Sequence, residues 1–290
     1  MEDRKPLSLG LLRHHLPALA GMGRVGLRSI LPRRAPAAQV APLTRTIPAP
    51  PQALVEHYLD WCGAAGRYPD TLPPHMVSQW GIAVSGALLM QTAYPLARIL
   101  NQGVILKIHG PLPRGVPLQL RASLCDVDGS QPGKLRFSVA IETGTAQQRK
   151  LLDTFLHLTI VQPGPREKRV RQTEDAPQHW SPAGSWQADA DDGLRFALLT
   201  GDFNPIHWFG PVARRSVFGG KVLHGFGTLV RSMETLDMAA LREIDVRFVR
   251  PVPLPSAALR VEHGAADDQG WRALRVAGSD ATIHLLGRYR

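Results

Sequence analysis

An internal repeat is the feature that most constrains how this chain of 290 residues can fold. A long apolar stretch with helical spacing occurs at 77–94, before Pro95, and again at 225–238. Each copy precedes segments in which apolar and polar residues alternate, and such alternation predicts strands with one buried face. A helix followed by antiparallel strands, given twice at an interval of roughly 140 residues, predicts a duplicated α+β unit. Each curved sheet would wrap around one apolar helix.

Each copy contains four predicted strands, separated by turns rich in Gly, Pro or Asp. They lie within 107–113, 117–123, 135–141 and 154–160 in the first copy, and within 246–253, 258–262, 271–276 and 281–286 in the second. A Pro-x-Pro separates the first two strands of both copies.

Proline-rich stretches bound the two copies. Residues 1–45 read as a basic arm, and 163–185 as a linker, because prolines disfavour the interior of helices and strands and the mixed charges there prefer water. The predicted organisation therefore places one unit at 46–162 and the other at 186–290.

The composition favours a folded chain that does not bind nucleic acid. Charged residues make up 20% and hydrophobic residues 44%, which allows a sizeable core. The net charge is +10, and the first 45 residues carry eight Arg and Lys against Glu2 and Asp3. Aromatic residues are only 6%, few for a basic surface that stacks on bases, so we interpret the arm as a solvated tail. A binder of nucleic acid resting on charge alone is the alternative.

The expected compartment is the cytoplasm. Cys62 and Cys125 have no CxxC partner, which favours two reduced thiols. No apolar run of 18 residues lacks polar breaks, so no membrane span is predicted. The acids Glu2 and Asp3 argue against a signal peptide, although the Arg-rich stretch 11–34 resembles an organellar transit peptide.

One segment concentrates side chains that can do chemistry. Residues 199–207 read Leu-Thr-Gly-Asp-Phe-Asn-Pro-Ile-His and place Asp202, Asn204 and His207 within six residues. Proline and asparagine favour a turn after a short helix over 194–199, so Asp202 and His207 could point at the same spot. An imidazole exchanges protons with water near pH 7, and a carboxylate can hold the other side of that water. The alternative is an Asx-turn that caps the short helix, with His207 at the surface.

Gly225 marks the start of the second apolar helix, directly after Val222-Leu-His224. Backbone N–H groups at a helix N-terminus are unpaired and lie at the positive end of the helix dipole. Aimed at a thioester carbonyl, they would form an oxyanion hole. The alternative is a glycine required for close packing.

The run from Phe196 to His207, followed by Ala213 and His224-Gly225, resembles the hydratase-2 motif of the MaoC-like family. That family holds (R)-specific enoyl-CoA hydratases and (3R)-hydroxyacyl thioester dehydratases with hot-dog folds. The duplicated pattern resembles its double-hot-dog members, such as the mycobacterial type of dehydratase, in which an N-terminal half without the motif pairs with a catalytic C-terminal half. The resemblance implies an α+β double hot-dog with one continuous curved sheet.

The resemblance also implies a hydro-lyase of fatty-acid metabolism, with no cofactor and no metal. The enzyme would reversibly hydrate trans-2-enoyl thioesters, or dehydrate (3R)-hydroxyacyl thioesters, carried by coenzyme A or an acyl carrier protein. Asp202 and His207 would activate the water that adds to C3, and one of them would deliver the proton to C2. Asn204 would orient that pair, and the Gly225 amide would hold the thioester oxygen.

Further residues are candidates for binding the substrate. Arg214, Arg215 and Lys221 suit the phosphates of the carrier, although a solvated basic loop explains them equally well. His224 and Phe226 flank Gly225 and are the remaining candidates.

The N-terminal unit lacks the motif. Its His75 precedes the apolar helix as His224 does, and without an orienting partner it reads as a structural or surface histidine rather than a second base. This unit would instead open a longer acyl tunnel. The chain is expected to be a monomer or homodimer, and a hot-dog acyl thioesterase or a non-catalytic acyl-thioester-binding protein are the alternative functions.

Overall fold

The computed structural model describes residues 10–11, 40–131, 133–161 and 179–290. Most of the predicted arm (1–45) and most of the predicted linker (163–185) lie outside the described residues.

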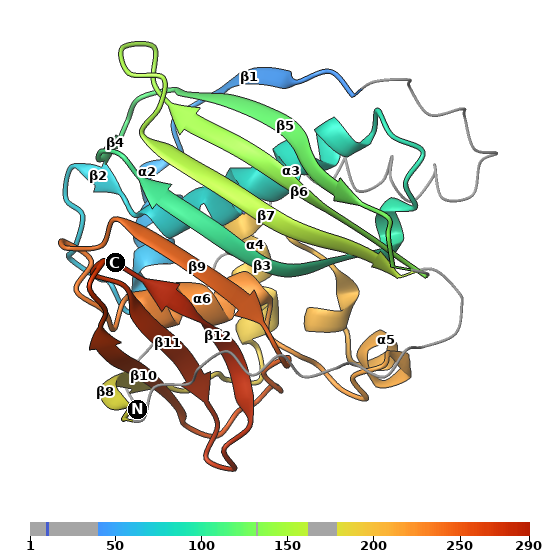
Figure 1. Cartoon of the computed structure of the whole chain (residues 1–290), viewed down its shortest axis with the longest axis vertical. Coiled ribbons are helices and arrows are strands. Elements are labelled where there is room, and N and C mark those ends of the chain that lie inside the picture. Colours follow the sequence, from blue (N-terminus) through green and yellow to red (C-terminus); the bar gives the residue numbers. More distant parts are fainter. Residues whose placement is uncertain (1–9, 12–39, 132, 162–178) are drawn as a thin grey trace.

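Ten strands form one continuous antiparallel sheet, as Figure 1 shows. In spatial order they are β1 (Leu43–Ile47), β5 (Leu118–Asp128), β6 (Lys134–Gly144), β7 (Leu152–Val161), β3 (Ile99–Ile108), β9 (Glu243–Phe248), β12 (Ile283–Tyr289), β11 (Arg272–Ala277), β10 (Leu259–Ala266) and β8 (Ser181–Trp186). The first five come from the N-terminal unit and the last five from the C-terminal unit. The antiparallel pairing of β3 with β9 joins the two units into the single curved sheet that the sequence predicts. A separate pair is formed by β2 (Thr71–Leu72) and β4 (Leu112–Pro113).

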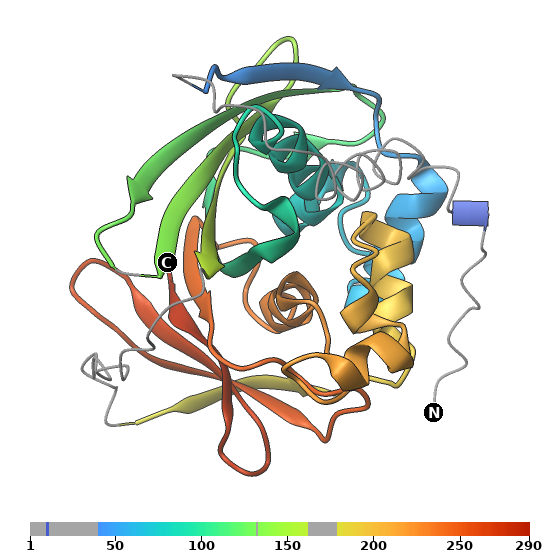
Figure 2. The same ribbon diagram turned by 90° about the vertical axis from the view of Figure 1, so that its right-hand side faces the viewer.

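Each unit has one central helix on the concave side of the sheet, which curves around both of them in Figure 2. These are α3 (Ser78–Leu89), preceded by the 3-10 turn η2 (Pro74–Val77), and α6 (Gly225–Met233). Both end earlier than predicted. The hydroxyls of Thr92 and Thr235 donate to backbone carbonyls of the final turns, and such bonds compete with continuation of a helix.

Other helical segments lie outside the two central helices. They include α4 (Asp192–Thr200), α5 (Gly210–Arg215) and the 3-10 turns η3 (Leu96–Arg98) and η4 (Pro205–His207). The predicted short helix over 194–199 is confirmed as part of α4.

A helix that the sequence analysis did not anticipate, α2 (Gln52–Cys62), packs on α4. The rings of Trp61 and Phe196 lie 4.9 Å apart at this contact. The helix stops at Gly63, whose φ of 83° is the left-handed conformation that glycine adopts without strain. The two units therefore meet through helices as well as through the sheet.

Two strands fall outside the predicted unit boundaries. β1 begins at Leu43, inside the predicted arm. β8 begins at Ser181, inside the predicted linker, ends at Trp186 and pairs with β10. Pro182 is tolerated because β8 is an edge strand, where a missing N–H costs no ladder hydrogen bond. The prediction that the linker extends to 185 is therefore wrong at its end: the sheet of the C-terminal unit begins at Ser181.

The core is continuous across the two units, since buried side chains from both belong to one apolar cluster. Among the described residues, no helix is long and apolar enough to cross a membrane.

Candidate active site

The motif turn joins α4 to η4 and is built by local hydrogen bonds. Gly201 ends α4 with a φ of 82°. Asn204 Oδ1 accepts a hydrogen bond from the backbone N–H of Ile206 at 3.4 Å, so the Asx-turn considered above is present and begins η4. The backbone N–H of Asn204 donates to Asp202 Oδ1 at 3.3 Å. The turn therefore fixes the Asp202 carboxylate, through the main chain of Asn204 rather than through its side chain.

His207 lies next to that carboxylate and is held in one tautomer. Its Nδ1–H donates to the carbonyl oxygen of Val222 at 2.7 Å, which leaves Nε2 as the acceptor of a neutral ring. A ring nitrogen of His207 and a carboxylate oxygen of Asp202 lie within 4.8 Å of each other. Burial lowers the pKa of His207, against the opposing effects of Asp202 and the Val222 carbonyl. His207 is therefore neutral at pH 7 and able to accept a proton, and Asp202, 26% exposed, is open to solvent.

His224 lies directly behind His207. The two rings stack with centroids 3.6 Å apart at an interplanar angle of 25°. His224 Nε2–H donates to the backbone carbonyl of Asp202 at 2.9 Å. Burial, followed by the neighbouring His207, lowers the pKa of His224 to about 3, so its ring is neutral. The structure thus gives His224 a supporting position beneath the pair instead of the substrate-facing position that the sequence suggested.

Gly225 is the first residue of α6, as predicted, so its N–H has no carbonyl partner within the helix. A Cβ at this position would lie 2.6 Å from the ring of Phe248, so close packing also requires glycine here. The neighbouring Phe226 is 4% exposed and packs in the core near Phe248. The sequence assigned Phe226 to the substrate, whereas the structure gives it a packing role.

The basic candidates lie between the motif turn and α6. Arg214 and Arg215 are exposed at the end of α5, and within the described part of the chain neither forms an ion pair. Lys221 donates to the carbonyl oxygen of Ala190. Two guanidinium groups therefore remain available to an anion, whereas Lys221 is tied to the loop before α4.

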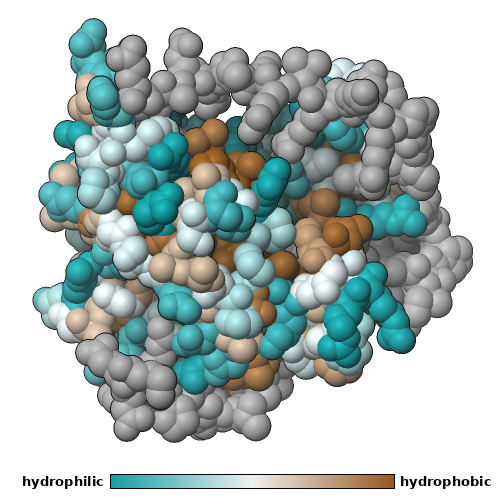
Figure 3. Space-filling view, turned by 90° about the horizontal axis from the view of Figure 1, so that it is seen from below, coloured by the Kyte–Doolittle hydropathy of each residue, from teal (hydrophilic) through white to brown (hydrophobic). Residues whose placement is uncertain are grey.

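An apolar surface beside the motif turn was missed from the sequence. On the face shown in Figure 3, apolar patches alternate with hydrophilic residues. The exposed large apolar residues that follow His207 are Trp208, Phe209, Val212, Val217 and Phe218. Their runs in the sequence (Trp-Phe and Val-Phe) could have signalled an exposed apolar loop.

The donor set at the turn also has the spacing of a cation site, because Asp202, His207 and His224 each offer a ligand atom within 4.8 Å of the others. The rings of His207 and His224 stack with an interplanar angle of 25°, so their lone pairs, which lie in the ring planes, do not converge on one ion. This arrangement suits proton transfer by His207 better than ligation by all three residues.

In the N-terminal unit, His75 occupies the place before α3 that His224 occupies before α6. It is fully buried, so the surface location that the sequence left open is wrong. Its Nε2 lies 2.6 Å from Glu234 Oε1, and Glu234 caps the C-terminal end of α6. His75 is thus bound into the interface between the units.

Residues 166–283 match the family model of the MaoC like domain. The C-terminal unit is a MaoC-like dehydratase domain. The resemblance seen in the motif is thereby confirmed for this part of the chain. Among curated proteins, no sequence matches the chain.

Solved structures with similar folds cover both units of the chain. HtdX of Mycobacterium tuberculosis matches with a TM-score of 0.69 at 18% identity, over 86% of this chain and 99% of that one. The peroxisomal multifunctional enzyme type 2 of Drosophila melanogaster matches with a TM-score of 0.66 at 19% identity, over 86% of this chain and 48% of that one. An acyl-ACP thioesterase of Bacteroides thetaiotaomicron matches with a TM-score of 0.55 at 9% identity, over 86% of this chain and 96% of that one. These likenesses confirm the α+β double hot-dog fold. At such identities they show the fold alone, so the substrate must be inferred from the chemistry of the site.

Proposed function

We propose that this MaoC-like chain reversibly hydrates trans-2-enoyl thioesters, with the reverse dehydration of (3R)-hydroxyacyl thioesters at the same site. The observation that carries the proposal is the pairing of the Asp202 carboxylate with a neutral His207 within 4.8 Å. The α6 N-terminus at Gly225 follows Val222, whose carbonyl orients His207. The site therefore offers a base, an orienting carboxylate and a backbone donor on one short stretch of chain.

In this mechanism Asp202 and His207 hold one water molecule between them. His207 Nε2 accepts a proton from the water as its oxygen bonds to C3 of the enoyl group. The electron pair of the double bond moves toward the thioester, whose oxygen takes up negative charge and accepts a hydrogen bond from the Gly225 N–H. A proton delivered to C2 from the acid–base pair completes the addition of one water molecule. Asn204 supports the step by fixing Asp202 through its own N–H.

The proposal is tested with Asp202→Asn and His207→Gln. We expect each to lower kcat for hydration of a trans-2-enoyl-CoA by about 10²–10⁴, the typical contribution of positioned acid–base groups. Loss of the conjugated enoyl absorbance measures the reaction. Asp191→Asn, an exposed carboxylate on the preceding turn, is the matched control and should keep full activity. Near-normal turnover by both site variants would contradict the assignment.

The same assay separates the alternative functions. A thioesterase would release free thiol without first losing the enoyl absorbance, and a non-catalytic binding protein would do neither. The thioesterases that share the fold make this a necessary measurement.

For the carrier we propose a phosphate-bearing group bound by Arg214 and Arg215, because both guanidinium groups are exposed beside the turn. The charge reversals Arg214→Glu and Arg215→Glu, combined, should raise KM for an enoyl-CoA about tenfold or more and leave kcat unchanged. A short enoyl thioester of N-acetylcysteamine, which has no phosphate, should show no change in KM. An unchanged KM for the CoA substrate would identify the two arginines as solvated surface residues.

The N-terminal unit, which lacks the motif, is proposed to accommodate the acyl chain. Comparing kcat/KM for enoyl-CoA substrates of increasing chain length, and for their acyl-carrier-protein counterparts, measures chain length and carrier preference together. A preference for the shortest chains would argue against this role.

A further inference from the structure

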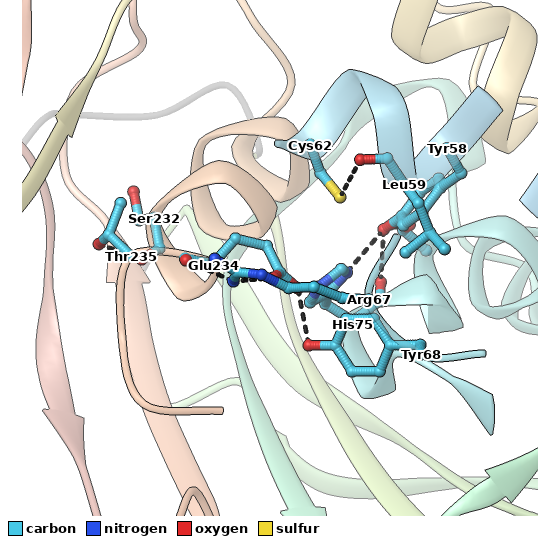
Figure 4. A network of polar contacts seen from close by, with 10 residues as sticks. Tyr58, Leu59, Cys62, Arg67, Tyr68, His75, Ser232, Glu234 and Thr235 are labelled. Atoms are coloured by element: carbon cyan, nitrogen blue, oxygen red, sulfur yellow. Dashed lines mark hydrogen bonds and ion pairs between the residues drawn. The ribbon is translucent and has the colours of Figure 1, made fainter. Parts of the chain in front are cut away.

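A second cluster of ligating side chains lies away from the motif turn, where the N-terminal unit meets α6. Figure 4 shows Cys62, His75 and Glu234 converging, with the Cys62 sulfur pointing toward the other two side chains. Each offers a ligand atom (Sγ, a ring nitrogen and a carboxylate oxygen) within 4.8 Å of the others. All three residues are at least nine-tenths buried, with exposures of 4%, 0% and 6%. We propose that these three residues form a zinc-binding site that joins the two units.

The three residues come from three separate elements. Cys62 is the last residue of α2, His75 lies in η2 before α3, and Glu234 caps the C-terminal end of α6. The first two belong to the N-terminal unit and the third to the MaoC-like unit. A metal ion here would link both units through residues that are 159 positions apart in the chain.

Surrounding groups hold the ligands in the orientation that a metal requires. The Tyr58 hydroxyl lies 3.1 Å from His75 Nδ1, which leaves Nε2 directed at Glu234. On Glu234, Arg67 pairs with Oε2 at 2.9 Å and the Tyr68 hydroxyl donates to Oε1 at 2.8 Å. Ligating histidines and carboxylates in proteins are oriented by such outer hydrogen bonds.

The donor set favours zinc over the hard cations. Thiolate, imidazole and carboxylate together suit Zn²⁺, whereas Mg²⁺ and Ca²⁺ take oxygen ligands only. His75 Nε2 and Glu234 Oε1 lie 2.6 Å apart, with a proton between them. A tetrahedral ion at about 2.0–2.1 Å from each would replace that proton and move the two atoms to about 3.3 Å apart, roughly 0.7 Å further than now.

The charges of the cluster allow Zn²⁺ to replace the protons that it holds. Burial raises the pKa of the Cys62 thiol, so the sulfur is protonated when no metal is bound. The thiol donates a weak hydrogen bond to the carbonyl oxygen of Leu59 at 3.3 Å. Binding Zn²⁺ would release that thiol proton and leave a thiolate and a carboxylate against the two charges of the ion. The alternative occupant of the cluster is protons alone, in a hydrogen-bonded network without metal.

Cobalt separates the two alternatives, because a thiolate bound to Co²⁺ gives a charge-transfer absorption that histidine and carboxylate ligands do not. The untagged full-length chain is unfolded, refolded with Co²⁺ and freed of excess metal, so that the buried site can load. We expect one Co²⁺ per chain and the thiolate band in the wild-type protein and in Cys125→Ser, and loss of the band in Cys62→Ser. Cys125 is the matched control because it is the chain's second cysteine and is distant in sequence.

Refolding with Zn²⁺ supplies a second readout. The unfolding temperature of wild type and Cys125→Ser should rise with zinc, whereas that of Cys62→Ser should not. Circular dichroism matched to wild type shows that Cys62→Ser is folded. Absence of the cobalt band from refolded wild type would overturn the site, as would equal zinc stabilisation of Cys62→Ser. Equal stabilisation would place the metal elsewhere, for example at the motif turn. None of these outcomes depends on hydratase activity.

Discussion

At the scale of single residues, the stacked pair of His207 and His224 decides the protonation of the candidate site. Their rings are too close for both to carry charge, with centroids 3.6 Å apart, and the deeper ring is the harder to protonate. The fold therefore keeps His207 beside a neutral neighbour, which is what a proton acceptor needs. Because the fold holds His224 neutral, the free energy of unfolding must depend on pH.

We expect acid to destabilise the protein through His224. Its pKa is about 3 when folded and near 6.5 when unfolded, so between these values the unfolded chain binds the extra proton. The free energy of unfolding should fall as the pH drops below about 6.5, by up to about 1.4 kcal/mol per pH unit from this residue. Urea unfolding of wild type and His224→Gln between pH 7 and 4.5 measures the difference.

His224→Gln should flatten the slope, whereas His179→Gln, an exposed histidine, should leave it unchanged. Parallel slopes for wild type and His224→Gln would show that His224 is protonated in the folded protein at these pH values.

At the scale of elements, the contact between α4 and η4 sets the position of the motif turn. Gly193, in the first turn of α4, lies against the backbone of His207, and a Cβ there would overlap the His207 carbonyl oxygen. Gly193→Ala should therefore displace η4, lower kcat for hydration by at least tenfold and destabilise the fold by about 1–3 kcal/mol.

Gly86→Ala is the control for Gly193→Ala. Gly86 lies inside α3 with open space at its Cβ, so alanine there should stabilise the fold by about 0.5–1 kcal/mol and leave activity unchanged. Thermal unfolding and the hydration assay test both variants. Equal behaviour of the two would mean that α4 does not position the turn.

The same elements show what the sequence could and could not predict. The turn chemistry of residues 202–207 is local, and the Asx-turn that it predicts is present. Strand periodicity is also local, but the strand predicted within 107–113 is wrong in its bounds, because β3 spans Ile99–Ile108 and ends before the turn at 109–111. Helix α2 also carries helical spacing of apolar residues before a glycine, so its signal was available and was overlooked. Strand β8 could not be predicted because Pro182, which an edge strand tolerates, is also typical of a linker. The positions of His75 and His224 depend on partners far away in the chain, which no local pattern encodes.

At the scale of the whole molecule, a tryptophan of the N-terminal unit packs on a buried ion pair of the MaoC-like unit. Arg231 of α6 binds both carboxylate oxygens of Asp192, at 2.8 and 3.0 Å, and both side chains are buried. Trp61 of the N-terminal unit donates to the same carboxylate at 2.9 Å, and its ring lies 4.2 Å from the Arg231 guanidinium. The MaoC-like unit therefore completes its own ion pair with a residue of its neighbour.

Asp192→Asn tests whether the two units unfold together. It removes the negative charge opposite the buried Arg231 guanidinium, so we expect the free energy of unfolding to fall by about 3–5 kcal/mol. One cooperative transition should be retained because the carboxylate contacts residues of both units. The control is Asp191→Asn, one residue before Asp192, which removes an exposed salt bridge with Arg195. It should change the free energy of unfolding by less than about 1 kcal/mol. Urea unfolding followed by both tryptophan fluorescence and far-UV circular dichroism measures the two variants. If Asp192→Asn split the transition in two, the units would be separate folding domains that share a sheet, and the motif turn could then be destabilised without unfolding the N-terminal unit.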